Sequence, residues 1–494
     1  MKKILDSVHG YINIDEDYCK EVIDTEYFQR LRRIEQTSTR SVFPSARHDR
    51  FIHSLGVFHL GCKIICSLKD KSVGLQANDQ LNNLETIYES YKLACLLHDV
   101  GHAPFSHTFE EFYDNQWSDL RNVLCVLVNV EQFTKDWNAV ADPSAPHEKM
   151  SAIIAIGIFG GFIEKKNADK ELVARMIIGL KYTDEINHSF ANAMIDLIHG
   201  DVVDADGLDY VCRDVWASGY STTKVDVERL IDSINIVKDE NGKYGLCFST
   251  KCLNEIESVL KVKTFQQLYV INHHTVTYEQ ALLIEAMRSA AVFHFYGEKD
   301  VIDSQKRKEA LEKLCNIKCL YDNECIGINT DITKINIKLP MDDDFISLMK
   351  YIRNDKYVHQ WLSRKYDLIA LWKSKAEFYQ NFDNLRNTIL TRNNWIFHYD
   401  CKSFITRKFN ISINDIWIKR ATPKYKDNYA KKVKLYVKNK IIDYQTLFPA
   451  DIHSYEPPQD EFYYIYVPKT VNKDDVLKAL KEEVAKYYIN IGRN

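Results

Sequence analysis

Residues 96–107 read LLHDVGHAPFSH, and this stretch places His98, Asp99, His102 and His107 directly after an apolar run. The run YKLACLL at 91–97 is apolar on all sides, as expected for a buried helix. If the helix continues, His98 and His102 share one face, because residues four apart are neighbours on a helix. Imidazole nitrogens and carboxylate oxygens suit divalent Mn, Fe, Co, Ni, Zn or Mg. The stretch therefore predicts either a metal site or a helix end with several polar residues.

Two other segments carry the same residue types beside apolar runs. ARHDRFIHSLGV at 46–57 contains His53, and HGDVVDADGLDYVCRD at 199–214 contains five aspartates, Asp206 among them. Alone, His53 reads as a buried core histidine and Asp206 as a cap or ion-pair partner. A histidine, then His-Asp, then an aspartate in three separate segments is the order of a mixed histidine–carboxylate metal site. The three segments together favour that site.

The composition limits the class of protein. The chain has 494 residues, 45% of them hydrophobic, with 65 Lys+Arg against 69 Asp+Glu. The near-neutral balance does not favour a nucleic-acid partner. Twelve cysteines without a CxxC pair indicate thiols in a reducing compartment rather than a disulfide framework. The N-terminus lacks a signal-peptide apolar region, and the run at 152–163 is shorter than the roughly twenty residues a membrane span needs. We expect a cytoplasmic protein with no membrane partner.

The hydrophobic pattern predicts a mainly α fold. Helical spacing runs from about residue 15 to 300, starting with 18–36 and ending in one long helix at 251–296. One β-hairpin is expected at 234–248, where Asn241-Gly242 supplies the turn. Beyond 300, strand-like runs at 431–440 and 461–469 precede a final amphipathic helix with Asn472 as N-cap. We therefore predict a helical core at 1–300 and a smaller mixed α/β lobe at 301–494.

The ordered motifs resemble those of the HD-domain phosphohydrolases. They read HGYINIDEDYCKEVIDTEYFQRLRRIEQ, FPSARHDRFIHSLGV, LLHDVGHAPFSHTFE, HEKMS and DADGLDYVCRD, and the likeness extends from about residue 6 to 285. Within that superfamily the chain is similar to the deoxynucleoside triphosphate (dNTP) triphosphohydrolases, both dGTPase-like enzymes and SAM-and-HD-domain dNTPases. The resemblance implies a helical HD core, a divalent metal, and metal-dependent hydrolysis of a dNTP to a deoxynucleoside and inorganic triphosphate.

The resemblance also implies roles for single residues. The implied metal ligands are His53, His98, Asp99 and Asp206. Three further residues take implied catalytic roles: His107 as proton donor or nucleophile-facing histidine, Glu110 orienting it, and His102, which with His147 lines the phosphate path. The residues implied to bind substrate, from phosphate to sugar, are Gln36, Arg50, His102, His147, Tyr210 and Asp214. Family members form dimers, tetramers or hexamers, many regulated by a nucleotide. A homo-oligomer with a nucleotide effector is thus expected, with the C-terminal lobe in assembly or regulation and 251–296 as an interface or core helix.

Three positions depart from the family pattern around the phosphates. Gly207 stands where Lys or Arg is usual, His274 replaces a lysine, and Lys263 replaces an arginine. A triphosphate carries about four negative charges that cations normally offset. Lys261, Lys263, His273 and His274 are the residues that could compensate. If they do not, two alternatives remain open: an HD phosphohydrolase acting on another nucleotide, a phosphomonoester or single-stranded nucleic acid, and a nucleotide-sensing regulatory protein that only binds.

Overall fold

The structure is a computed structural model, and it describes residues 1–71, 84–110, 117–142, 144–200, 202–220, 224–297, 303–322, 324–329, 334–382, 394–421, 433–447 and 462–489. The chain forms two compact units that are interleaved in sequence. The first comprises residues 1–263, 290–348 and 426–456, and the second comprises 264–289, 349–425 and 457–494. The sequence placed a single boundary near 300 instead, because local patterns do not show late segments that return to an earlier core.

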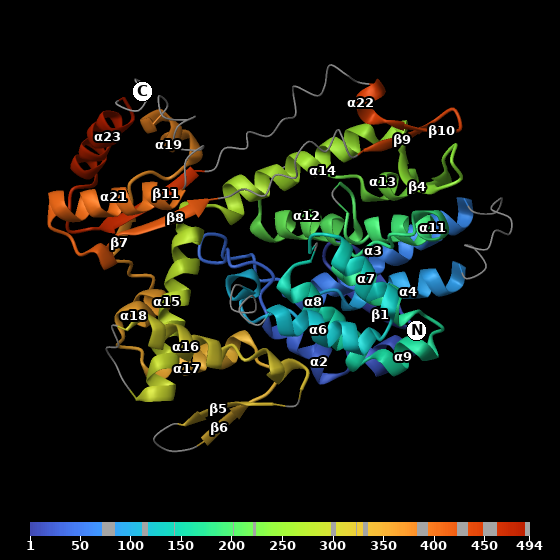
Figure 1. The fold of residues 1–494 in the computed structure, drawn as a ribbon, viewed down its shortest axis with the longest axis horizontal. Coiled ribbons are helices and arrows are strands. Elements are labelled where there is room, and N and C mark those ends of the chain that lie inside the picture. The colour runs from blue at the N-terminus through green and yellow to red at the C-terminus, as the bar shows by residue number, and fades with distance from the viewer. Residues whose placement is uncertain are drawn as a thin grey trace. The chain divides into compact units, whose positions relative to one another are not determined.

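The first unit is built around one long buried helix. Helix α3 (Arg50–Lys71) packs against α4 (Leu84–Leu97) and α12 (Ala205–Ser218), as Figure 1 shows. By length and composition α3 is long enough to cross a membrane, but 72% of that window is buried inside the protein, as in a core helix. Further helices of this part include α6 (Trp117–Val128), α7 (Glu131–Ala139), α8 (Pro146–Gly157), α9 (Gly160–Lys165), α10 (Lys170–Ile178), α11 (Glu185–Asp196), α13 (Val227–Ser233) and α16 (Ser304–Leu314). The predicted mainly α fold is confirmed.

The N-terminus departs from the helical prediction. Strands β1 (Lys2–Asp6) and β2 (Gly10–Ile14) form an antiparallel hairpin that the sequence analysis did not anticipate. The helix expected at 18–36 is divided into short pieces, including α1 (Glu16–Tyr18) and α2 (Glu26–Gln29). Thr25 is the cause of one break, because its side chain accepts a hydrogen bond from Phe28 N and so starts a new helix.

The hairpin predicted at 234–248 is confirmed and belongs to a larger sheet. Strands β3 (Ile234–Lys238) and β4 (Tyr244–Ser249) pair antiparallel. Strand β9 (Lys434–Val437) then pairs parallel to β4 and antiparallel to β10 (Lys440–Asp443), giving the order β10-β9-β4-β3. A segment assigned to the C-terminal lobe from sequence therefore completes the sheet of the first unit. A second hairpin, β5 (Ile326–Asn329) with β6 (Lys334–Ile337), precedes α17 (Asp342–Tyr351).

The second unit has its own core around a three-stranded antiparallel sheet. The strand order is β7 (Leu368–Ala370), β11 (Phe462–Pro468), β8 (Trp417–Ala421), with β11 in the centre. Six consecutive residues of β11 are buried, which explains its run of aromatic and branched side chains. The neighbouring helices, α18 (Lys356–Ser363), α19 (Lys375–Phe382), α21 (Asn394–Phe409) and α23 (Lys473–Ile489), are coloured orange to red in Figure 1. Asp474 N donates to Asn472 Oδ1 over 2.9 Å, confirming the predicted cap of α23.

The long helix expected at 251–296 is interrupted. Helix α14 (Leu253–Phe265) ends in a π-helical turn (Gln266–Ile271), and α15 (His274–Tyr296) begins after it. Asn272 Nδ2 donates to Gln267 O over 2.8 Å, an example of an asparagine side chain competing with helical hydrogen bonds. Tyr464 Oη and Tyr466 Oη donate to the carbonyls of Asn272 and His274. Strand β11 thus satisfies backbone groups that an unbroken helix would have used.

Candidate metal centre

The four predicted metal ligands come from three separate elements of the first unit. His53 lies on α3, and Asp206 lies in the first turn of α12. His98 and Asp99 follow the end of α4 at Leu97 and lie in a turn, where His102 N donates to Asp99 O over 3.1 Å. The expectation that His98 and His102 share one helical face is therefore wrong. The helix stops at Leu97, before the motif, so His98 and His102 are not neighbours on a helical face.

Ligand atoms of His53, His98 and Asp99 lie within 4.8 Å of one another, and Asp206 lies beside the two histidines. His53 Nε2 is 3.0 Å from Asp206 Oδ1, 3.3 Å from His98 Nε2 and 3.5 Å from Asp99 Oδ2. His98 Nε2 is 3.6 Å from Asp99 Oδ1 and 3.8 Å from Asp206 Oδ1. Around an ion with bonds of about 2.1 Å, neighbouring ligand atoms lie about 3.0 to 3.5 Å apart. The donor set thus fits one divalent cation, and the predicted cofactor class is confirmed.

The ring orientation of both histidines is fixed from behind. His53 Nδ1 donates to Asp209 Oδ2 over 2.7 Å, and His98 Nδ1 donates to Cys95 O over 3.0 Å. Each Nε2 therefore keeps its lone pair towards the common centre. Burial would raise the pKa of Asp209, but hydrogen bonds from His53 and His9 and the Arg213 guanidinium hold that pKa well below its usual range.

Asp209 is the centre of a buried network that the sequence analysis did not assign. His9 Nε2 lies 2.6 Å from Asp209 Oδ1, and Arg213 links Asp209 to Asp6 through contacts of 2.8 Å. Gly56 of the HSLGV motif makes room for this network, because a Cβ there would overlap the Asp209 carboxylate. The spacing of Asp206, Asp209 and Arg213 on one helix face could have revealed part of it. His9 gave no such signal.

Arg50 contacts a metal ligand. Its Nη1 lies 2.7 Å from Asp99 Oδ2, its Nε donates to Ser106 Oγ, and its Nη2 donates to Gln36 O. Burial would raise the pKa of Asp99, but Arg50, His98 and His102 hold it well below its usual range. Because Arg50 is only 4% exposed, its guanidinium serves the metal centre and the neighbouring loop. Contacts of Arg50 and Gln36 with a substrate remain predictions.

Three histidines and Glu110 form a second cluster next to the first. Glu110 Oε2 lies 2.6 Å from His107 Nδ1, and Glu110 Oε1 lies 2.5 Å from His147 Nδ1. The His102 ring stacks on His147, with centroids 4.2 Å apart and planes 17° from parallel. Both ring nitrogens of His102 are buried without a hydrogen-bond partner among the described residues. The predicted catalytic and phosphate-facing residues are thus brought together.

The pKa values of this cluster separate His147 from His102 and His107. Burial lowers the pKa of His147, but the hydrogen bond that its Nδ1 donates to Glu110 outweighs burial and raises the pKa overall. Burial lowers the pKa of His107 in spite of its own hydrogen bond to Glu110. Burial and then Arg50 lower the pKa of His102 well below its usual range. The nitrogens of the three rings are also close enough to share a metal ion. Lone pairs lie in the ring planes, however, so the stacked rings of His102 and His147 do not aim theirs at one point. We therefore interpret this cluster as a proton and phosphate site.

Three more predicted residues lie on or beside α12: Tyr210 and Asp214 are part of the helix, and Lys263 contacts its N-terminal end. Asp214 Oδ1 lies 2.8 Å from His48 Nε2, and Tyr210 lies 5.4 Å from the ammonium of Lys263. Lys263 Nζ is 3.9 Å from Asp204 Oδ2, and it lies 2.6 Å from where a Cβ on Gly207 would be. The Lys263 ammonium therefore occupies the space that a side chain at position 207 would take. The tertiary structure thus places the Lys263 ammonium beside position 207, where the family motif usually has a lysine or arginine.

His273 and His274 belong to the second unit, where their rings lie 4.3 Å apart. Burial lowers the pKa of His274 to about 4, so its imidazole is neutral near pH 7. A neutral ring does not replace the positive charge of the family lysine. The substrate contacts of His273 and His274 remain predictions.

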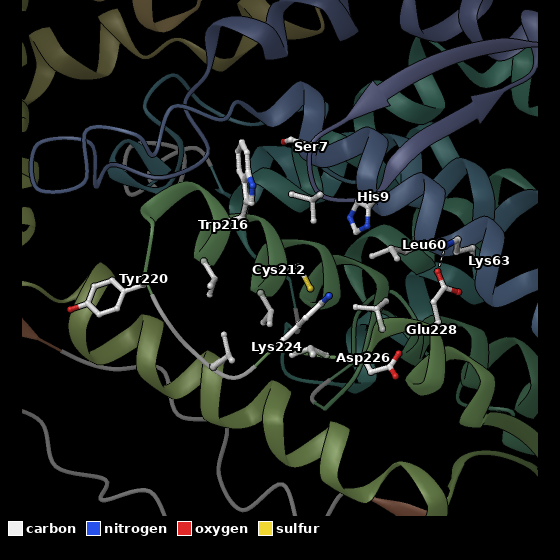
Figure 2. A pocket seen from close by; sticks show the side chains of 16 residues that line it. Ser7, His9, Leu60, Lys63, Cys212, Trp216, Tyr220, Lys224, Asp226 and Glu228 are labelled. Atoms are coloured by element: carbon white, nitrogen blue, oxygen red, sulfur yellow. Dashed lines mark hydrogen bonds and ion pairs between the residues drawn. The ribbon is translucent and has the colours of Figure 1, made fainter.

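A separate cavity of about 800 Å³ lies on another side of α12. Figure 2 shows Cys212 and Trp216 of α12 and His9 around it, with the Lys63–Glu228 ion pair at one end. Of the described residues predicted for the site, none lines this cavity. It touches the metal centre only indirectly, through the hydrogen bond from His9 to Asp209 and from there to His53.

Comparisons with known proteins agree with this geometry. Residues 50–122 match the sequence family described as HD domain, and this range contains His53, His98 and Asp99. The Dictyostelium discoideum homolog of the deoxynucleoside triphosphate triphosphohydrolase SAMHD1 is 29% identical over 297 residues, covering 59% of this chain and 50% of that protein. Bos taurus SAMHD1 is 41% identical over 111 residues, covering 22% of this chain and 18% of that protein. The chain therefore spans about half or less of these relatives.

Two solved structures share the fold along nearly the whole chain. A hypothetical protein from Aquifex aeolicus has a TM-score of 0.61 at 21% identity, covering 97% of this chain and 99% of that one. A phosphohydrolase from Bacteroides thetaiotaomicron has a TM-score of 0.60 at 19% identity, covering 94% and 99%. Residues 50–122 therefore match the HD domain, and the chain resembles the dNTP triphosphohydrolases.

Proposed function

We propose that this protein hydrolyses deoxynucleoside triphosphates, releasing the deoxynucleoside and inorganic triphosphate in one metal-dependent step. The observation that carries the proposal is the juxtaposition of two clusters. Four metal donors with fixed orientation lie beside the Glu110–His107–His147 group, and Asp99 Oδ1 is 3.8 Å from His102 Nε2 between them. The curated relatives named for this reaction support the substrate class.

Each cluster has a distinct task in this proposal. A divalent cation held by His53, His98, Asp99 and Asp206 supplies Lewis-acid activation of a phosphate group. His107 is 58% exposed and its Nδ1 donates to Glu110, so in the protonated, imidazolium form its Nε2 gives a proton to the departing sugar oxygen. His147, whose pKa is raised by its hydrogen bond to Glu110, lies beside the phosphates. Lys263 adds a positive charge, and Tyr210 and Asp214 face the deoxyribose.

One observation favours a second candidate. Arg50 is tied to Asp99 and Gly207 offers no side chain, so fewer free cations surround the phosphate position than a triphosphate normally meets. A substrate with less charge, such as a phosphomonoester or another nucleotide, would suit that arrangement. This candidate uses the same metal centre and the same acid–base pair.

The test is a substrate panel with defined products. Purified protein is incubated with each dNTP and with Mn²⁺ or Mg²⁺, and the products are separated. Deoxynucleoside together with tripolyphosphate is the expected outcome. Monophosphate with pyrophosphate, or no turnover of any dNTP, would rule the proposal out. Turnover of a phosphomonoester alone would support the second candidate.

A double variant, His98→Ala with Asp99→Ala, tests whether the reaction depends on the metal centre. Loss of turnover with retained nucleotide binding assigns the reaction to the metal centre. Unchanged function in this variant would instead favour a nucleotide-sensing protein. Elemental analysis of the wild type should give about one metal per chain. We also propose a homo-oligomer with a nucleotide effector, for which light scattering with and without each dNTP is the measurement.

A further inference from the structure

The loop from Val100 to Phe109 carries His102 and His107, and part of its backbone is in an unfavourable conformation. Phe105 and Ser106 have φ angles of +56° and +51°. The left-handed region is disfavoured for residues with a side chain, because Cβ approaches the following carbonyl. Such a conformation persists only where surrounding contacts hold it. The contacts that hold this loop are therefore informative about how His107 is positioned.

Asp342, in the first turn of α17, supplies one of these contacts. Its Oδ1 accepts a hydrogen bond from Phe105 N over 2.6 Å, and its Oδ2 accepts one from Glu35 N over 3.0 Å. The carboxyl group is 5% exposed and lies 237 residues away from Phe105 in sequence. It fixes the amide of the residue where the left-handed conformation begins.

Two more contacts join the same short segment to the loop. Phe345, one helical turn after Asp342, stacks on Phe109 with centroids 6.2 Å apart and planes 15° from parallel. Arg30, 1% exposed, donates to His102 O over 2.5 Å, to Val100 O over 3.3 Å and to Pro340 O over 3.1 Å. We call Pro340, Asp342 and Phe345 the α17 anchor. It holds the loop at both ends of the segment that carries the two histidines.

We propose that Asp342 is a positioning residue for the reaction, acting with Arg30 through the backbone of the loop to place His107 and His102. The catalytic part of this inference rests on the proposed function. Among the described residues, no contact joins the α17 anchor to His53, His98, Asp99 or Asp206. The anchor is thus separable from the metal centre. Its loss should displace the acid–base pair while the metal donors stay together.

The experiment compares Asp342→Ala and Asp342→Asn with Asp343→Asn. Asp343 is the adjacent aspartate, 63% exposed, and it makes a surface ion pair of 3.2 Å with Arg33. Amide exchange of the peptide covering 100–109 is measured first, because this readout needs no substrate. Exchange should be faster in Asp342→Ala, intermediate in Asp342→Asn, which keeps one acceptor oxygen, and unchanged in Asp343→Asn. Metal content per chain should stay at the wild-type value in all three.

Steady-state kinetics then tests the link to catalysis. We expect kcat of Asp342→Ala to fall about 10- to 100-fold with KM within about threefold, because misplacement of a catalytic group by about 1 Å costs rate of that order. Unchanged exchange, or a kcat equal to that of Asp343→Asn, would overturn the inference. If Asp342→Ala does not fold, the milder Asp342→Asn decides. Should the wild type turn over no dNTP, the proposed function fails, while the exchange result still decides the anchor.

Discussion

The site has two regions that differ in how their side chains are held. We call His53, His98, Asp99 and Asp206 the metal end, and His102, His107, Glu110 and His147 the phosphate end. At the metal end His53, His98 and Asp99 are held by buried partners, which are Asp209 paired with Arg213, the Cys95 carbonyl and Arg50. At the phosphate end both ring nitrogens of His102 are buried without a hydrogen-bond partner among the described residues, and His107 is 58% exposed. The histidines of the metal end are held by protein partners, whereas His102 leaves polar atoms that water or a ligand can satisfy.

This difference separates binding of the cation from binding of the substrate. A buried polar atom without a partner costs free energy, so it persists where a ligand will supply the partner. The hydrogen bonds at Nδ1 of His53 and His98 fix their tautomers and keep their Nε2 atoms in place before any substrate arrives. Substitutions in the two regions should therefore have different signatures, and the following predictions are ordered by the size of the expected effect.

Asp206→Ala should cause the largest loss. It removes one of four metal donors, so we expect metal content well below one per chain and activity reduced at least about 10³-fold. Elemental analysis and the dNTP panel measure both effects, with Asp343→Asn as the matched control. Full metal occupancy in this variant would show that Asp206 is not a ligand.

His107→Ala should reduce activity without removing the metal. Loss of a general acid typically lowers the rate about 10²- to 10⁴-fold. Metal content should equal that of the wild type, because Glu110 and His147 remain and no metal donor is touched. Glu110→Gln should give a smaller loss. If His107→Ala also loses its metal, the two ends are not separable in the way proposed.

Asp209→Asn should lower metal affinity, because Asp209 orients the metal ligand His53 through a hydrogen bond. An asparagine amide cannot accept from both His53 and His9 as the carboxylate does, and such changes typically cost about 10- to 100-fold in metal affinity. Titration of metal-free protein with Mn²⁺ measures this. An affinity equal to that of the wild type would mean that the His53 orientation is set by packing alone.

Lys263→Ala should affect the phosphate end only. Removing one cation should raise KM for a dNTP about tenfold with metal binding unchanged. Gly207→Lys in the Lys263→Ala background should restore the lower KM, because the ammonium then comes from the position usual in the family. In the wild-type background the same Gly207→Lys change should not help, since Lys263 already fills that space. A KM unaffected by either substitution would remove Lys263 from the site.

The pH dependence of stability should report the α17 anchor. Burial raises the pKa of Asp342 from 3.8 to about 8, and the neighbouring Asp343 adds to this while Arg30 opposes it. Between those two pH values the folded state binds more protons than the unfolded state, so the free energy of unfolding falls as pH rises. We expect a slope of about 1 kcal/mol per pH unit between pH 5 and 8 that Asp342→Asn lacks. Urea unfolding at several pH values measures it, and parallel curves for the two proteins would contradict it.

The sequence predicted the fold class and the residues of both clusters because each motif is local. An apolar run before His-Asp marks a buried helix end, and Asn241-Gly242 marks a turn, whatever lies around them. The break before α15 was missed for the opposite reason. It involves partners distant in sequence, because Tyr464 and Tyr466 of β11 donate to the carbonyls of Asn272 and His274. The break at Thr25 comes from a local cap within a run of helical spacing. Helical spacing alone cannot show where a helix is interrupted because its backbone carbonyls bond to side chains of another element.

By itself the sequence determined which side chains can hold a divalent cation and which can carry a proton, because those properties belong to the residue types and their order. Only the tertiary structure decided which residues orient these side chains and which charges surround them. Asp209 supports His53 across 156 residues, Lys263 fills the space above Gly207, and Asp342 holds Phe105 across 237 residues. The physical reason is that orientation and charge balance come from packing between distant elements, which no local pattern encodes.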